Sequence, residues 1–255
     1  MHAIVLAGQP NHGLLKVHSS AAYESEIVVA GRRMADWVLD ALEEAPSVSS
    51  IGLVGPESLR REGVVMGAMT GTLFGNIVAG LKTAPAHAEM VLFVTSDIPW
   101  ITADIVEAFL RSAPRDRDVV YPVIPKSEVL ARFGSSKRTY VRLKEGVFTG
   151  GNIFLARVDA VPQLKAQAER LIAHRKSPWK LAQDVGWGLL ARFVTGRLSL
   201  DDVETRVGGV LGITGRALIF PYAEAGVDVD KPEDLRLAEL ELSRSRREVQ
   251  GWDIS

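Results

Sequence analysis

Short apolar runs alternate with segments of helical periodicity along the first half of the chain, and this alternation constrains the fold more than any other feature. The first run covers 2–7 and ends at Gly8. Apolar runs of this length, bounded by turn residues, are typical of buried strands in a parallel sheet. Apolar residues spaced three and four apart, as between Met34 and Leu42, are typical of amphipathic helices.

Both patterns repeat as far as residue 124 and return near the end of the sequence. We expect strands at 2–7, 51–54, 90–94, 119–124 and 217–220, and helices at 34–42, 73–81, 102–110 and from 231 onward. This order predicts an α/β fold with a doubly wound, mostly parallel central sheet, whose ligands bind at the carboxyl ends of the strands. Gly8 and Asp97 each follow an expected strand, so both should lie at that edge.

We expect one domain, 1–255, with a helical insertion at 158–210 in its C-terminal half. Apolar residues recur at helical spacing within 158–210, and no strand pattern interrupts them. The hydrophobic content of 47% and the charged content of 24% fit an ordinary globular protein and argue against a disordered or fibrous one. Single α/β domains commonly reach roughly 250 residues, so the length requires no second domain.

The charge and the cysteine count exclude several classes of function. Thirty basic and 31 acidic side chains leave a net charge of -1, so we expect neither a nucleic-acid partner nor a membrane surface. The absence of cysteine excludes disulfides, a thiolate nucleophile and a cysteine zinc site. The first residues carry no basic signal region and no run of about 20 apolar residues occurs, so the expected location is cytoplasmic.

Asp97 directly follows the most apolar of the expected strands. A carboxylate at the open end of a central strand suits a hard cation such as Mg²⁺, which prefers oxygen ligands and bridges to phosphate oxygens. The alternative is that Asp97 caps the helix expected from Thr102.

Asp228 and Asp230 flank Val229. In an extended backbone, residues two apart project from the same face, so the two carboxylates would suit one cation. The alternative is that Asp230 caps the helix that begins at Lys231 or Pro232.

The loop from Gly8 to Lys16 is a candidate phosphate site, although it matches neither GxxxxGK[ST] nor GxGxxG. Its glycines allow close backbone approach, and Lys16 supplies a mobile positive charge. The alternative is a surface loop with a solvated lysine.

A basic group precedes a glycine pair further along the chain. The group consists of Lys126, Arg132, Lys137, Arg138 and Arg142, and it is followed by Gly150, Gly151 and Asn152. Such a group can clamp a phosphorylated acceptor through charge-assisted hydrogen bonds. The alternative is a solvated charged face.

Five segments, taken together and in order, resemble the MobA-like nucleotidyltransferase family. They are Ile4–Gly8, Gly31–Met34, Ser96–Pro99, Phe148–Asn152 and Asp228–Leu235. The resemblance implies the GT-A fold, a Rossmann-like three-layer sandwich. It also implies a reaction in which an acceptor oxygen attacks the α-phosphorus of a nucleoside triphosphate and pyrophosphate is released.

The resemblance also implies roles for single residues. Catalytic roles fall to Lys16, Asp97 and Arg138, with Lys137 beside Arg138 on the acceptor's phosphate. Nucleotide or acceptor contacts fall to Leu6, Ala7, Gly8, Gln9, Asn76, Ile77, Gly80, Ser96, Gly150, Gly151 and Asn152. Asp97, Asp228 and Asp230 would hold Mg²⁺ or Mn²⁺. The implied partners are a nucleoside triphosphate and a small phosphorylated acceptor, and a homodimer is left open.

Two departures from the family pattern keep other functions open. Gln9 stands where relatives usually have a second glycine, and Glu24 lies close to the position of an expected lysine. A degenerate nucleotide-binding protein without turnover is therefore one alternative. A GT-A glycosyltransferase that uses a nucleotide-sugar is another, since the same fold serves that chemistry.

Overall fold

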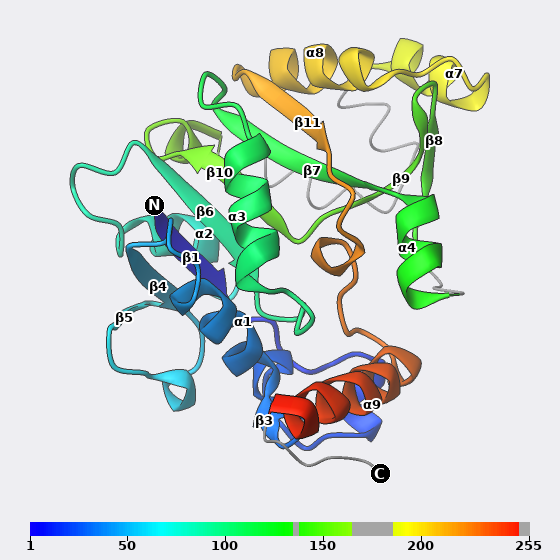
Figure 1. Cartoon of the computed structure of the whole chain (residues 1–255). Helices are drawn as coiled ribbons and strands as arrows, with labels where there is room; N and C mark the ends of the chain where they lie inside the picture. The colour runs from blue at the N-terminus through cyan, green and yellow to red at the C-terminus, as the bar shows by residue number, and fades with distance from the viewer. Residues whose placement is uncertain (135–137, 165–185, 250–255) are drawn as a thin grey trace.

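A central sheet with helices on both faces forms the body of the protein (Figure 1). The structure is a computed structural model that describes residues 1–134, 138–164 and 186–249. No helix in these ranges is long and apolar enough to cross a membrane. The expected three-layer α/β architecture is confirmed.

The main sheet has the strand order β5-β4-β1-β6-β10-β7-β9-β8, and β11 pairs with the other edge of β7. The strands are β1 (His2–Leu6), β4 (Ser50–Val54), β5 (Val64–Gly67), β6 (Met90–Thr95), β7 (Val119–Pro125), β8 (Val141–Leu143), β9 (Gly146–Gly150), β10 (Ile153–Arg157) and β11 (Gly215–Ile219). A separate ribbon pairs β2 (Val28–Val29) with β3 (Arg32–Arg33). The sheet is mixed: the strands from β5 to β6 are parallel, and β10 is antiparallel to both β6 and β7.

The pairing register of the central strands makes them end at the same level of the sheet. Leu6 at the end of β1 pairs with Val54 of β4 and with Thr95 of β6. All five residues of β1 are buried. Because the three strands run parallel and stop at the same level, the residues that follow them meet at one edge of the sheet.

Successive residues of a strand point to opposite faces of the sheet, so each face has its own part of the core. Val5 faces α1 (Met34–Glu43) and α3 (Ala103–Ser112), whereas Ile4 faces α2 (Leu73–Leu81). The remaining helices are α4 (Lys126–Phe133), α7 (Trp187–Val194), α8 (Leu200–Leu211) and α9 (Pro232–Val249). Single 3₁₀ turns are η1 (Leu14–Val17), η2 (Glu24–Glu26), η3 (Glu57–Leu59), η4 (Val161–Leu164) and η5 (Ala223–Ala225).

Hydroxyl side chains mark where three of these helices begin. Thr72 accepts a hydrogen bond from the Gly75 amide at 3.1 Å and caps α2. Thr102 caps α3, and Ser199 caps α8 in a reciprocal capping box with Asp202. Each cap satisfies backbone N–H groups that have no partner within the helix.

The expected strands and helices of the first half are confirmed, within one or two residues at their ends. The antiparallel arm formed by β8, β9 and β10 was not expected. β9 and β10 run along one edge of β7 and are separated only by Gly151 and Asn152. Within the predicted insertion, η4, α7 and α8 are helical, and 165–185 lie outside the described residues.

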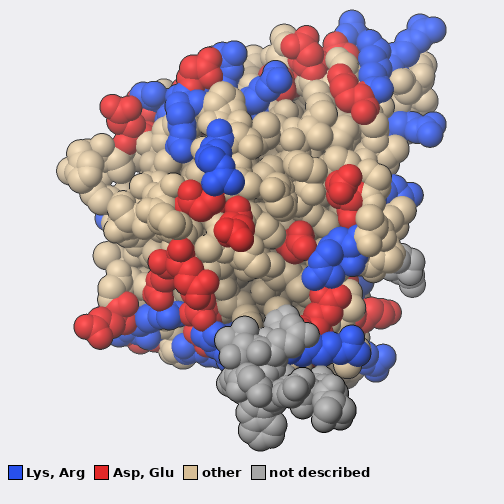
Figure 2. Space-filling model, viewed as in Figure 1, with Lys and Arg blue, Asp and Glu red and all other residues tan. Residues whose placement is uncertain are grey.

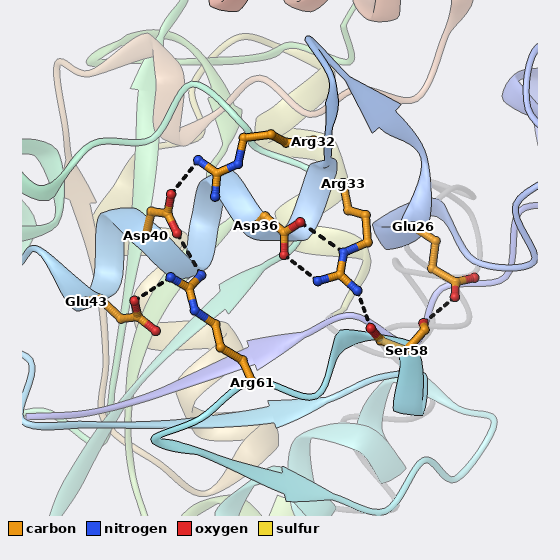
Figure 3. Close-up of polar contacts among 8 residues, drawn as sticks. All are labelled: Glu26, Arg32, Arg33, Asp36, Asp40, Glu43, Ser58 and Arg61. Carbon is orange, nitrogen blue, oxygen red and sulfur yellow. Dashed lines mark hydrogen bonds and ion pairs between the residues drawn. The ribbon is translucent and has the colours of Figure 1, made fainter. Parts of the chain in front are cut away.

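An ion-pair network ties α1 to the chain around it (Figure 3). Asp40 binds Arg32 at 2.6 Å and Arg61 at 2.7 Å, and Arg61 also reaches Glu43 at 2.7 Å. Burial raises the pKa of Asp40, but the hydrogen bonds from the two guanidinium groups outweigh it and leave the pKa below its ordinary value. The network therefore anchors β3 and the turn before β5 to α1.

Asp40→Ala is expected to lower the free energy of unfolding by about 1 kcal/mol, because pairs at this partial exposure are weakened by solvent screening. Urea unfolding measures the change. Asp116→Ala is the control, since its side chain is 69% exposed in a loop, and it should change the value by less than about 0.5 kcal/mol. Equal effects of the two substitutions would contradict the assignment.

Candidate active site

Three separate parts of the chain meet where β1 and β6 end. The amide of Ser96 donates to the carbonyl of Leu6 at 3.2 Å, which joins the two strand ends. The amide of Val229 donates to the carbonyl of Asp97 at 2.8 Å. The segment before α9 is therefore fixed beside Asp97, so the structure brings Asp97 and the predicted acidic pair together.

Asp97 lies at the open end of the central strand, as the sequence predicts. Its capping alternative is wrong, because Thr102 caps α3 with its own hydroxyl. Burial raises the pKa of Asp97. The hydrogen bond from the Thr95 hydroxyl and the charge of Arg138 oppose this rise, and the charge of Asp230 adds to it.

Glu24, at the start of η2, completes a group of mutually repelling carboxylates. Burial and the charges of Asp97 and Asp230 raise the pKa of Glu24 to about 7. We call Glu24, Asp97 and Asp230 the carboxylate cluster. Among the described residues, no three His, Cys, Asp or Glu side chains are placed to hold a metal ion by themselves. Sequence reasoning noted Glu24 only as a departure from the family pattern and missed its place in the site.

Arg138 occupies the other side of the acidic pair. Its side chain is only 6% exposed and forms an ion pair with the Asp228 carboxylate. It also donates to the Asp228 carbonyl and lies 3.4 Å from the Asp234 carboxylate. In this structure Asp228 is therefore directed to Arg138, while Asp230 is coupled to the carboxylate cluster and lies 3.5 Å from Lys231 Nζ.

Gly8, which follows β1, and Asn76, on α2, lie close together at the carboxyl edge of the sheet. Asn76 is 6% exposed, and its Oδ1 accepts from the Thr70 amide at 2.8 Å and from the Thr70 hydroxyl at 3.1 Å. A Cβ on Gly8 would lie 2.7 Å from Asn76 Nδ2, so the glycine allows this close approach. Gly80, on α2, packs closely against β1: a Cβ on Gly80 would lie 2.5 Å from Ile4 Cγ2.

The loop after Gly8 is held by buried polar contacts. Asn11 is fully buried and donates to the carbonyls of Ser19 and Ala21, each at 3.1 Å. The carbonyl of Gln9 accepts from the amide of Glu24 at 3.0 Å, which places Glu24 against this loop. Lys16 is exposed on η1. The carbonyl of Ala7, which follows β1, accepts from the hydroxyl of Ser25 at 2.8 Å.

Gly150, Gly151 and Asn152 lie where β9 turns into β10. A Cβ on Gly150 would lie 2.4 Å from the Tyr121 hydroxyl, and one on Gly151 would lie 2.6 Å from the Pro122 ring. The Asn152 amide donates to the carbonyl of Ala225 at 2.7 Å, and its own carbonyl accepts from Thr95 at 2.9 Å. Both glycines thus permit close approach to β7, and Asn152 connects the arm to β6.

The described basic residues predicted to hold phosphate make separate contacts, and Arg138 is paired with Asp228. Arg132 pairs with Glu224 and Glu241. Arg142 is exposed on β8, and Lys137 lies outside the described residues. Figure 2 shows basic and acidic side chains mixed over the face seen in Figure 1. Binding of an anion at this face would therefore depend on local groups and backbone N–H donors.

Comparison with known proteins adds a family and a fold. The family model described as MobA-like NTP transferase domain matches residues 25–181. No curated protein gives a significant match. A hypothetical transferase from Thermus thermophilus is 39% identical, with a TM-score of 0.81 over 92% of this chain and 98% of that chain.

Two solved enzyme structures share the fold at low identity. CMP:2-keto-3-deoxy-manno-octonic acid synthetase, complexed with CTP, is 13% identical with a TM-score of 0.63 over 95% of this chain and 98% of that chain. The Thermus thermophilus 2-C-methyl-D-erythritol 4-phosphate cytidylyltransferase is 18% identical with a TM-score of 0.51 over 95% and 98%. At these identities the likeness establishes the fold alone.

Glu24→Gln is expected to stabilise the free protein at alkaline pH. With a pKa of about 7 in the folded chain against an ordinary 4.5, Glu24 costs stability as the pH rises from 4.5, and the loss is complete above about 7. The amide does not titrate. The difference in Tm between variant and parent should therefore grow by roughly 3 °C from pH 5 to pH 8.

Glu62→Gln is the control for this measurement, because Glu62 is exposed and lies outside the carboxylate cluster. Its difference in Tm should stay constant over the same pH range. A constant difference for Glu24→Gln as well would show that Glu24 does not face the other two carboxylates.

Proposed function

The chain belongs to the MobA-like NTP transferase family, a family of nucleotidyltransferase enzymes, and on that premise we propose that it transfers a nucleotidyl group from a nucleoside triphosphate to a small phosphorylated acceptor. The observation that carries the proposal is the convergence of Asp97 and Asp230 at the carboxyl edge of β1 and β6. The Val229 hydrogen bond holds the two segments together there. Open parallel sheets bind ligands at this edge.

A divalent cation fits the chemistry of this edge. Carboxylate oxygens are the ligands that Mg²⁺ prefers, and it commonly takes one or two of them together with substrate phosphates and water. Asp97 and Asp230 meet that need without a third protein ligand. The raised pKa of Glu24, caused by burial and by these two charges, marks a repulsion that a cation would relieve. Asp228 would join them only after leaving Arg138.

The cation, when bound, would neutralise negative charge on the triphosphate oxygens. The chain itself positions the reactants. The backbone of Leu6, Ala7 and Gly8 would lie along the triphosphate, with Asn76 Nδ2 offering a donor to the base or ribose. Lys16 is exposed on η1 and offers a mobile positive charge beside the same loop.

In the proposed reaction an oxygen of the acceptor's phosphate forms a bond to the α-phosphorus of the triphosphate. The bond from that phosphorus to the bridging oxygen breaks, and pyrophosphate leaves with the electron pair. A phosphate monoester group has mostly lost its second proton at pH 7. The attacking oxygen is then already deprotonated, so no general base is required. Gly150, Gly151 and Asn152 would line the acceptor side, and positioning accounts for most of the rate.

A nucleotide-binding protein without turnover is the second candidate. Glu24 favours it, because this chain has a carboxyl group close to the position where the family pattern leads us to expect a lysine. A third carboxylate beside the triphosphate weakens binding unless a cation or a proton neutralises it. The cytoplasmic location and the homodimer stay predictions.

Asp97→Asn and Asp230→Asn test the proposed function. We expect the parent to release pyrophosphate with at least one triphosphate, in a magnesium-dependent manner, when it is supplied with phosphorylated acceptors. Each variant should lower the rate by at least about 100-fold, because each removes an electrostatic contact that the transition state needs. Asp116→Asn, in an exposed loop, should leave the rate unchanged.

The products separate the alternatives. Release of a nucleoside diphosphate from a nucleotide-sugar would identify a glycosyltransferase instead. A magnesium-dependent rise in Tm with a triphosphate, but no pyrophosphate, would identify a binding protein. No rise in Tm with any of the four triphosphates at millimolar concentration would refute nucleotide binding altogether.

A further inference from the structure

An apolar cavity of about 400 Å³ lies between α8 and the sheet. In Figure 1, α8 passes above β11 and β7 at the upper end of the molecule. The side chains that define the cavity come from both sides: Tyr121, Val123, Phe148, Val203, Val207 and Leu211. Cavities that bind small molecules are typically 300–1,000 Å³ and largely apolar, so this one is within the usual range.

The two walls of the cavity face each other without packing closely. Leu200, Val203, Val207 and Leu211 form one stripe on α8, yet only Leu200 among them is buried. Tyr121 on the opposite wall is 41% exposed. Protein interiors are normally close-packed, so the space that the described residues leave between two apolar walls is a place where a ligand can complete the packing.

Small residues on β11 keep this space open. Gly215 pairs with Val119 and Ala217 with Tyr121, so both point to the same face as the β7 residues that line the cavity. A Cβ on Gly215 would meet no atom within 4 Å. Packing therefore does not require a glycine at this position.

A strand that lines the cavity leads towards the candidate active site. Phe148 and Gly150 line it, and the same strand continues to Asn152, whose carbonyl accepts from Thr95. Thr95 also binds Asp97 through its hydroxyl. Phe148 and Asn152 are four residues apart, and four residues of extended strand span about 13 Å. A molecule of moderate length can thus have one end near Asp97 and the other in the cavity.

Two charged side chains beside the cavity, Glu204 and Arg216, have partners within the protein. Glu204 accepts from the Ala217 amide at 2.9 Å and lies 3.4 Å from Arg216. The rest of the lining is mainly apolar, so hydrocarbon is the chemistry that fits.

We propose that this cavity binds an aliphatic or aromatic part of the acceptor, while the acceptor's phosphate lies near Asp97. The inference rests on the proposed function and names its substrate class: a phosphorylated amphiphile rather than a purely polar phosphate. Apolar contacts in the cavity strengthen binding of the acceptor, and the carboxyl edge of the sheet holds the acceptor's phosphate where it reacts.

Isothermal titration with n-octyl phosphate and ethyl phosphate, without nucleotide, tests the proposal. Each buried methylene strengthens binding about threefold to fourfold. We therefore expect octyl phosphate to bind at least about 100-fold more tightly than ethyl phosphate, allowing for incomplete burial of the six additional methylenes. Equal affinities would overturn the proposal.

Two substitutions that fill the cavity sharpen the test. Gly215→Leu and Ala217→Phe should each weaken octyl phosphate binding by at least about tenfold and leave ethyl phosphate binding unchanged. Leu240→Phe is the matched control, because Leu240 is 60% exposed on α9. Circular dichroism checks that each variant folds, and one folded variant is sufficient. Undiminished octyl phosphate binding in a folded variant would place the alkyl chain elsewhere and overturn the proposal.

The rise in Tm with magnesium and each triphosphate, measured on the same preparations, separates this inference from the proposed function. If triphosphates bind and octyl phosphate does not, the cavity proposal fails and the nucleotidyl function stands. If octyl phosphate binds as expected and no triphosphate does, the cavity is a ligand site but its role in acceptor binding is refuted.

Discussion

The hydrogen bond from the Val229 amide to the Asp97 carbonyl is the contact on which the candidate site depends. It joins the end of the central strand β6 to a segment that follows the last strand of the chain. Val229 is fully buried, so the bond is protected from water and an unpaired amide there would be costly. With this bond in place, Asp230 is fixed near Asp97 at an edge that the parallel register of β1 and β6 has already aligned.

That arrangement concentrates negative charge, and the chain balances only part of it. Arg138 pairs with Asp228, approaches Asp234 and acts on Asp97 by its charge, but Asp97, Asp230 and Glu24 still repel one another. A free protein with such a cluster sacrifices stability, and perturbed carboxylates in that position are typical of functional sites. The repulsion among these carboxylates therefore lies at the edge of the sheet where open parallel sheets bind ligands.

The elements that the sequence predicts well are those with strong periodicity. Helix α1 and strand β6 are confirmed because their apolar spacing reflects burial in the central core. The antiparallel arm was missed, since β8 and β9 are short and partly exposed, so the pairing of β9 with β7 and of β8 with β9 decides them. The strand-end rule located Asp97, whereas the approach of Glu24 and the pairing of Arg138 with Asp228 join residues that no local pattern connects.

A crystal structure with Mn²⁺ and a non-hydrolysable analogue of the triphosphate that stabilises the protein most would show whether Asp97 and Asp230 hold a cation together. We predict a peak in the anomalous difference density at about 2.0–2.3 Å from carboxylate oxygens of Asp97 and Asp230 and from a phosphate oxygen. A triphosphate bound at another edge of the sheet, or a cation that touches neither carboxylate, would contradict this prediction.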